Sequence, residues 1–178
     1  RGKENAHLHG CREPSRSGPR LNNLAKLYHT QGQYAQAEPL FKRALAIREK
    51  ALGPNHRDVA ISLNNLAEVY NTQGQYGPTE PLYKRALVIN EKALGPDHPY
   101  VATSLNNLAE LYRTQGQYTQ AEPLHNRALA IREKTLGPDH LDVDQSLNNL
   151  ALLYRATKRD NEAEVLERRA ARIQAIQR

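Results

Sequence analysis

The chain has 178 residues, of which 39% are hydrophobic and 25% are charged, and its formal net charge is +6. This composition is typical of a soluble globular protein, and it contains neither an apolar run long enough to cross a bilayer nor the apolar core of a secretory signal. The positive charge is confined to residues 1–20 and 155–178, each with an excess of three, so residues 21–154 are neutral. The absence of a long apolar run argues against a membrane-spanning protein, and the charge pattern argues against nucleic acid as the partner.

Cys11 is the single cysteine of the sequence. One cysteine allows neither an intrachain disulfide nor a zinc site built from thiolates. We therefore expect a cytoplasmic protein without a bound metal or other cofactor. The sequence also contains no Met, which leads us to expect a fragment or a processed chain.

Residues 1–18 are expected to form a loose N-terminal arm. Residues 14–19 read Pro-Ser-Arg-Ser-Gly-Pro, a composition that disfavours a packed core. Residues 1–20 also fail to match the stretch 43–62 that corresponds to them one repeat later. We expect this arm to contribute little to stability.

From residue 19 onward the sequence repeats with a period of 42 residues. The string Leu-Asn-Asn-Leu-Ala begins at four equally spaced positions, Leu21, Leu63, Leu105 and Leu147. Gln-Gly-Gln-Tyr and Leu-Gly-Pro-Asn/Asp-His recur in the same register in the first three copies. This regularity indicates a repeat protein, with repeats at about 19–56, 57–98, 99–140 and 141–178.

Each repeat is expected to form two helices. In the second copy the positions i, i+3, i+4 and i+7 form the apolar stripe of a helix: Leu63, Leu66, Ala67 and Tyr70. Gly74 ends this helix, and Gly95-Pro96 ends the next one. The predicted helices span residues 22–31, 34–52, 58–73, 76–94, 99–115, 118–136, 143–156 and 160–177. The first helices are expected to be capped by Asn55, Asp97 and Asp139.

The order of large and small residues in the second copy resembles the tetratricopeptide repeat, at Leu63, Leu66-Ala67, Tyr70, Gly74, Tyr76, Thr79, Tyr83 and Ala86. The 42-residue period and the strings Glu-Pro-Leu and Leu-Gly-Pro-Asp-His resemble the kinesin light chain type of this repeat. The resemblance covers residues 20–178. It implies an all-α, right-handed superhelical solenoid of antiparallel helix pairs. It also implies a scaffold that binds a protein or peptide segment in a concave groove lined by first helices, without enzymatic activity.

The fourth copy departs from this pattern. Lys158 and Asp160 replace Gly-x-Tyr, and Glu167 stands where the second copy has Tyr83. Such a polar copy is typical of a terminal repeat.

Each first helix carries a pair of Asn residues, although Asn is a mediocre helix former. At 100° per residue the second Asn of each pair lies opposite the apolar stripe, and its amide can both donate to and accept from a peptide backbone. We expect these four residues, Asn23, Asn65, Asn107 and Asn149, to bind the partner. The alternative is that they bond neighbouring helices, and this framework role is the favoured one for the first Asn of each pair.

Polar residues around this row vary between copies and are the expected source of side-chain specificity, with ordinary solvated surface as the alternative. Lys26, Glu68, Glu110, Thr72 and Thr114 lie near the row, and Asn71 and Arg113 lie on its flank.

Three loop histidines, His56, His98 and His140, recur one repeat apart, too distant to share a metal ion, and are assigned to helix-cap packing. No phosphate loop, nucleophile elbow or His-Glu-x-x-His motif is present. Two alternatives to a protein-binding scaffold remain: a nucleic-acid-binding solenoid that uses the basic ends, and an oligomerisation module that associates end to end.

Overall fold

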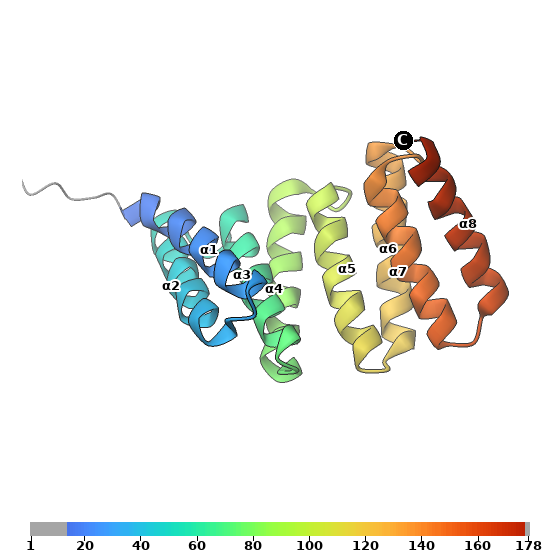
Figure 1. The fold of residues 1–178 in the computed structure, drawn as a ribbon. Helices are drawn as coiled ribbons and strands as arrows, with labels where there is room; N and C mark the ends of the chain where they lie inside the picture. Colours follow the sequence, from blue (N-terminus) through green and yellow to red (C-terminus); the bar gives the residue numbers. More distant parts are fainter. Residues whose placement is uncertain (1–13, 177–178) are drawn as a thin grey trace, which may run out of the picture.

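The computed structural model describes residues 14–176, which form eight helices and no strand (Figure 1). The first two pairs are α1 (Pro14–Thr30) with α2 (Tyr34–Leu52), and α3 (Arg57–Thr72) with α4 (Tyr76–Leu94). The last two pairs are α5 (Pro99–Thr114) with α6 (Tyr118–Leu136), and α7 (Leu141–Ala156) with α8 (Asp160–Ile176). From α2 onward every helix begins and ends within two residues of its predicted bounds.

The start of α1 corrects the expected boundary of the N-terminal arm. The helix begins at Pro14, so residues 14–18 are helical, and the rest of the predicted arm, 1–13, lies outside the described residues. Proline is tolerated in the first turn of a helix, where the amide it lacks would have no intrahelical partner. Gly18 is buried against α2, because a Cβ built on it would lie 3.4 Å from Cγ of Arg48. Gly18 is in register with the buried Ala60, so the small-residue position of the repeat extends further toward the N-terminus than expected.

The turn inside each repeat uses a residue in the left-handed backbone region. Gly74 adopts φ 71°, and Gly32 and Gly116 adopt φ 73°. The fourth repeat places Lys158 there with φ 60°, the single non-glycine residue with positive φ among the described residues. The turn therefore survives the loss of glycine, at the steric cost that a Cβ brings in this conformation.

The caps of the first helices are histidines and not the preceding Asn or Asp residues. The Nδ1 atoms of His56, His98 and His140 each accept a hydrogen bond from the backbone amide two residues later, at 3.1, 3.1 and 3.0 Å. The predicted caps Asn55, Asp97 and Asp139 were wrong by one residue, because the first helices begin one residue later in the loop than those caps require. The histidines have the helix-cap role that their recurrence indicated.

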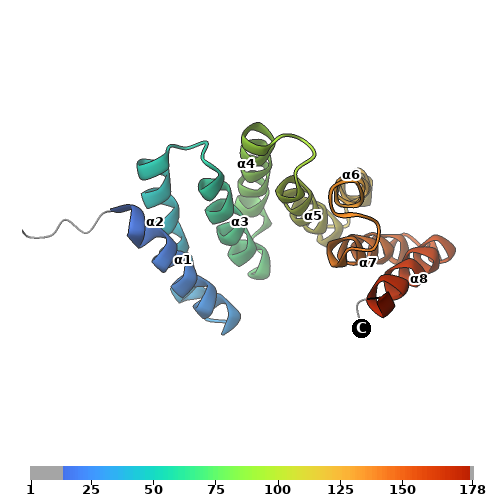
Figure 2. The same ribbon diagram turned by 90° about the horizontal axis from the view of Figure 1, so that it is seen from above.

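The helix pairs stack along an arc. Figure 2 shows α1, α3, α5 and α7 on the inner side of the arc and α2, α4 and α6 on its outer side. The core lies between successive pairs: Leu66 and Val69 of α3 pack with Ala37 and Phe41 of α2. Each pair therefore buries its apolar face against the next, as in a solenoid.

A buried polar bond also recurs between neighbouring repeats. Arg48 of α2 donates from Nη1 to Ser62 Oγ of α3 at 2.7 Å, and Arg132 of α6 donates in the same way to Ser146 Oγ of α7 at 2.9 Å. Asn90 occupies the equivalent position of α4 and donates to Ser104 Oγ at 2.9 Å. These bonds join α2, α4 and α6 to the first helix of the next repeat.

Candidate functional site

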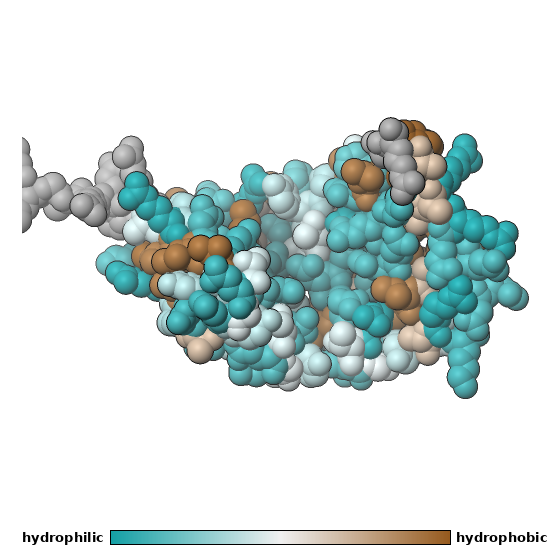
Figure 3. Space-filling view, viewed as in Figure 1, coloured by the Kyte–Doolittle hydropathy of each residue, from teal (hydrophilic) through white to brown (hydrophobic). Residues whose placement is uncertain are grey.

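The inner face of the arc forms a groove lined by α1, α3, α5 and α7. Figure 3 views this face, which is hollowed in the middle and mostly hydrophilic there. Hydrophobic atoms gather over α1 at one end and on α7 at the other. A polar middle with few apolar contacts suits a ligand that is held by hydrogen bonds.

The first Asn of each pair belongs to the framework. Asn22 and Asn106 are only 4% and 6% exposed. Asn106 donates from Nδ2 to Ser146 Oγ of the next repeat at 3.2 Å and accepts at Oδ1 from His125 Nδ1 at 3.0 Å. Asn148 donates to Asp144 Oδ1 within its own helix at 2.9 Å. Asn22 and Asn106 therefore bond neighbouring repeats, whereas Asn148 bonds within its own helix, and Oδ1 of Asn64 is buried without a hydrogen-bond partner among the described residues.

The second Asn of each pair is predicted to lie on the groove side, and one of the four is engaged internally. Asn23 is exposed, and Asn107 and Asn149 are half-buried. None of these three side chains has a hydrogen bond to another described residue. Asn65 differs, because its Nδ2 donates to Asn22 Oδ1 of the preceding repeat at 2.8 Å. Three amides of the predicted row are therefore available to a ligand, and Asn65 is shared with the framework.

The two groove carboxylates have different surroundings. Glu68 is exposed and accepts a hydrogen bond from the Tyr83 hydroxyl at Oε2, at 2.8 Å. Burial raises the pKa of Tyr83, and the charge of Glu68 raises it further, so the phenol remains a donor. Glu110 is bound at both oxygens by the guanidinium of Arg113, with Arg113 Nε 2.8 Å from Oε2. Glu68 therefore presents the stronger negative charge to the groove, while Lys26 is exposed at the end of the groove formed by α1.

The remaining predicted residues are less suited to bind a ligand. The hydroxyls of Thr72 and Thr114 donate to backbone carbonyls of the preceding turn, at 2.8 and 2.7 Å. Asn71 is half-buried, and its Oδ1 is buried without a hydrogen-bond partner among the described residues. The two threonine hydroxyls therefore serve first to satisfy carbonyls at the ends of α3 and α5.

Two residues beside the groove were not predicted. Leu152 of α7 is exposed and occupies the repeat position of Lys26, Glu68 and Glu110. The 42-residue register alone would have identified it. The other is His125, which is fully buried behind Asn106 and has an Nε2 atom without a partner. Burial lowers the pKa of His125 to about 4, with the charges of Glu110 and Arg113 acting in opposite directions.

No group of three or more His, Cys, Asp or Glu residues within 14–176 is arranged to hold a metal ion. None of the helices in that range is long and apolar enough to cross a membrane.

The sequence matches the family model described as tetratricopeptide repeat over residues 20–87, 79–134 and 105–175. The chain belongs to the tetratricopeptide repeat family. A putative kinesin light chain from Podosopora anserina, with nearly identical TPR-like repeats, is 30% identical. The match covers 96% of this chain and 81% of that protein, with a TM-score of 0.74. No curated protein matches the sequence.

Two further solved structures share the fold of this chain. BtubC (BKLC) from P. vanneervenii is 29% identical, over 96% of this chain and 68% of its own, with a TM-score of 0.84. Aspartyl phosphate phosphatase F from Bacillus subtilis has a TM-score of 0.80 over 92% of this chain and 42% of its own. Its identity of 15% shows a shared fold alone. Together these likenesses confirm a right-handed tetratricopeptide solenoid of the kinesin light chain-like type.

Proposed function

We propose that this chain is a non-catalytic scaffold that binds an extended or helical segment of another protein in its groove. The observation that carries the proposal is the separation of the two Asn rows. Asn22 and Asn106 are buried and bonded within the framework, whereas Asn23, Asn107 and Asn149 are at least partly exposed and have no hydrogen bond to another described residue. Asn is a mediocre helix former, so the binding of a ligand would explain why Asn occupies these positions of the first helices.

The chemistry of the free amides suits a peptide backbone. Each amide offers a donor and an acceptor at once, and Asn107 and Asn149 occupy equivalent points on neighbouring first helices. A backbone that crosses the groove could therefore be held at successive points independently of its side chains. The net contribution is about 0.5–1.5 kcal/mol for each hydrogen bond formed.

Side-chain selection would come from the row one turn beyond the amides. Along the groove this row reads Lys26, Glu68, Glu110 and Leu152. Because Arg113 already neutralises Glu110, Glu68 is the carboxylate in the middle of the groove that has no ion pair with a described residue. We expect a partner segment with a basic side chain near its centre and an apolar one toward α7. This specificity rests on the same proposed groove.

Ion pairs near the C-terminal end of the solenoid weigh against the nucleic-acid alternative. Three guanidinium groups there lie against carboxylates, Arg159 with Glu122 and Glu162, Arg168 with Glu164, and Arg169 with Glu133, while Arg172 has no ion pair with a described residue. A paired guanidinium is a weaker site for phosphate, because a phosphate must displace the carboxylate. We place the scaffold in the cytoplasm, in keeping with its single cysteine and the redox state of that compartment.

Peptides selected from a random displayed library on the immobilised chain provide a ligand for the test. The double variant Asn107→Ala, Asn149→Ala should bind these peptides roughly tenfold to a few hundredfold more weakly, at 1.4 kcal/mol per factor of ten. Asn126→Ala is the matched control, because Asn126 is an exposed Asn of the outer helix α6. Equal affinity for the double variant and the wild type, or a loss confined to Asn126→Ala, would contradict binding in the groove.

A further inference from the structure

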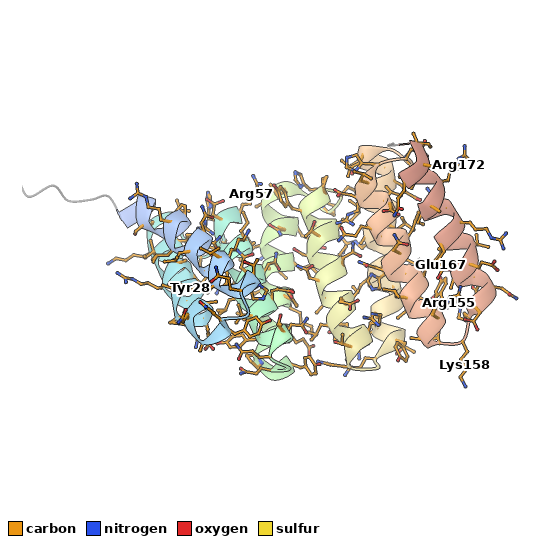
Figure 4. All side chains as sticks on the ribbon, viewed as in Figure 1. Tyr28, Arg57, Arg155, Lys158, Glu167 and Arg172 are labelled. Carbon is orange, nitrogen blue, oxygen red and sulfur yellow. The ribbon has the colours of Figure 1, made fainter. Side chains whose placement is uncertain are left out.

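Arg57, the first residue of α3, carries a charge that no carboxylate among the described residues neutralises. Arg57 is half-buried, and its Nε is buried without a hydrogen-bond partner in the described part of the chain. Its Cζ lies 4.2 Å from the centre of the Tyr100 ring, a cation–π contact that holds the guanidinium against α5. Figure 4 labels Arg57 at the upper edge of the inner face. A carboxylate from outside would give this group the ion pair that it lacks.

Glu68 carries the opposite charge on the same face of α3. It stands eleven residues after Arg57, which is close to three full helical turns and a distance of about 16 Å along the helix axis. Glu68 is exposed and forms no ion pair with a described residue. The Tyr83 hydroxyl donates to its Oε2 at 2.8 Å, which leaves Oε1 open to a second donor. The face of α3 therefore presents a cation at its start and an anion three turns later.

The next two first helices do not repeat this pair of charges. On α5, Pro99 stands at the position of Arg57, and Glu110, the counterpart of Glu68, is paired with an arginine of its own helix. On α7 the two positions hold Leu141 and Leu152, each 52% exposed. The opposite charges of α3 are therefore a local feature and do not come from the part of the sequence that recurs in every repeat.

We propose that Arg57 binds an acidic side chain of the partner segment while Glu68 binds a basic one, so that the two charges fix how the segment lies along α3. This inference rests on the proposed function, in which the groove holds the segment, and adds the charge pattern that the segment must have. A distance of about 16 Å corresponds to about five residues of an extended chain, at 3.3 Å each. In a helical segment it corresponds to about eleven residues.

Selection from a random displayed peptide library tests this pattern. Peptides selected on the wild-type chain should share an acidic and a basic residue at one of the two spacings. Peptides selected on Arg57→Glu should carry a basic residue in place of the acidic one. The variant should fold, because an acidic residue is favourable in the first turn of a helix, and circular dichroism checks this.

Affinities of one peptide selected on the wild type then assign each charge. The peptide should bind Arg57→Glu about three- to tenfold more weakly, and replacement of its acidic residue by Lys should reverse this preference. Glu68→Gln should also weaken binding, although it keeps an oxygen that accepts from Tyr83. The matched control is Lys92→Glu, which reverses an exposed charge without an ion pair to a described residue on the outer helix α4 and should leave the affinity unchanged.

Two results would overturn the inference. One is a set of peptides selected on the wild type without the shared acidic and basic residues. The other is a loss of affinity for Arg57→Glu that is no larger than for Lys92→Glu. Either result leaves the groove proposal intact if Asn107→Ala with Asn149→Ala still weakens binding of the same peptides. Unchanged binding by that double variant would instead contradict the groove proposal.

Discussion

Acidification should destabilise the solenoid through His125. The ring is fully buried, with Nδ1 3.0 Å from Asn106 Oδ1 and Nε2 without a partner. A second proton would therefore enter a buried position that offers no acceptor. Burial lowers the pKa of His125 from 6.5 to about 4.

The direction in which stability changes with pH follows from the number of protons that the folded and unfolded chains bind. Between pH 6.5 and about 4 the unfolded chain carries a proton on His125 and the folded chain does not, so stability rises with pH in this window. The contribution is fully present above pH 6.5 and is lost as pH falls through the folded value near 4. At about 1.4 kcal/mol for each pH unit, the loss amounts to about 3 kcal/mol, a large part of the stability of a typical domain.

Urea denaturation followed by circular dichroism at pH 7 and pH 4.5 measures the effect. His125→Phe is the natural comparison, because Phe41 fills the same position of the first repeat. Carboxylates also titrate in this range, so the informative quantity is the difference in pH dependence between the two proteins. The wild type should lose about 2–3 kcal/mol more than His125→Phe. An equal loss in both proteins would refute the assignment of a neutral buried His125.

Three further predictions concern the framework and are measured by thermal unfolding. Arg132→Ala should lower the free energy of unfolding by about 2–3 kcal/mol because it removes a buried donor. Arg132→Asn should recover about half of that loss, as Asn90 makes the equivalent bond. Equal losses in the two variants would show that the bond to serine is unimportant. Lys158→Gly should stabilise by about 1 kcal/mol because the turn has positive φ, and an unchanged or lower melting temperature would contradict the cost assigned to it. Asn106→Ala should cost about 1–3 kcal/mol while Asn107→Ala stays within about 0.5 kcal/mol, and the reverse order would exchange their roles.

The repeat register accounts for most of what sequence alone could predict about the fold. Glycine and Gly-Pro signals are local, because they act through backbone conformation at the residue itself. They placed α2, α4 and α6 with the bounds that the structure has. The start of α1 was missed because Pro14 and Gly18 disfavour a helix by composition, whereas burial of Gly18 against α2 is a tertiary contact. The caps were missed because histidine is not among the usual capping residues.

The sequence predicts which face of the first helices carries the candidate site, which stays a prediction, but it does not predict the side-chain contacts around that face. Angular position on a helix separates Asn106 from Asn107, since adjacent residues point about 100° apart. It cannot show that Asn65 reaches Asn22 on the neighbouring helix, because that bond depends on how closely the two helices approach. The pairing of Glu110 with Arg113 is different, because the two residues are three apart on one helix and their spacing alone could have predicted it.

Photo-crosslinking tests the central claim most directly. A benzophenone amino acid replaces either Thr103, exposed on α5 one turn before Asn107, or Asn126, exposed on the outer helix α6. Each labelled chain is irradiated with a peptide selected on the wild type, and the crosslinked peptide is quantified by mass spectrometry. If the groove holds the partner segment, the peptide crosslinks from position 103 and not from position 126; crosslinking from position 126 alone would place the binding surface on the outer face and contradict the account.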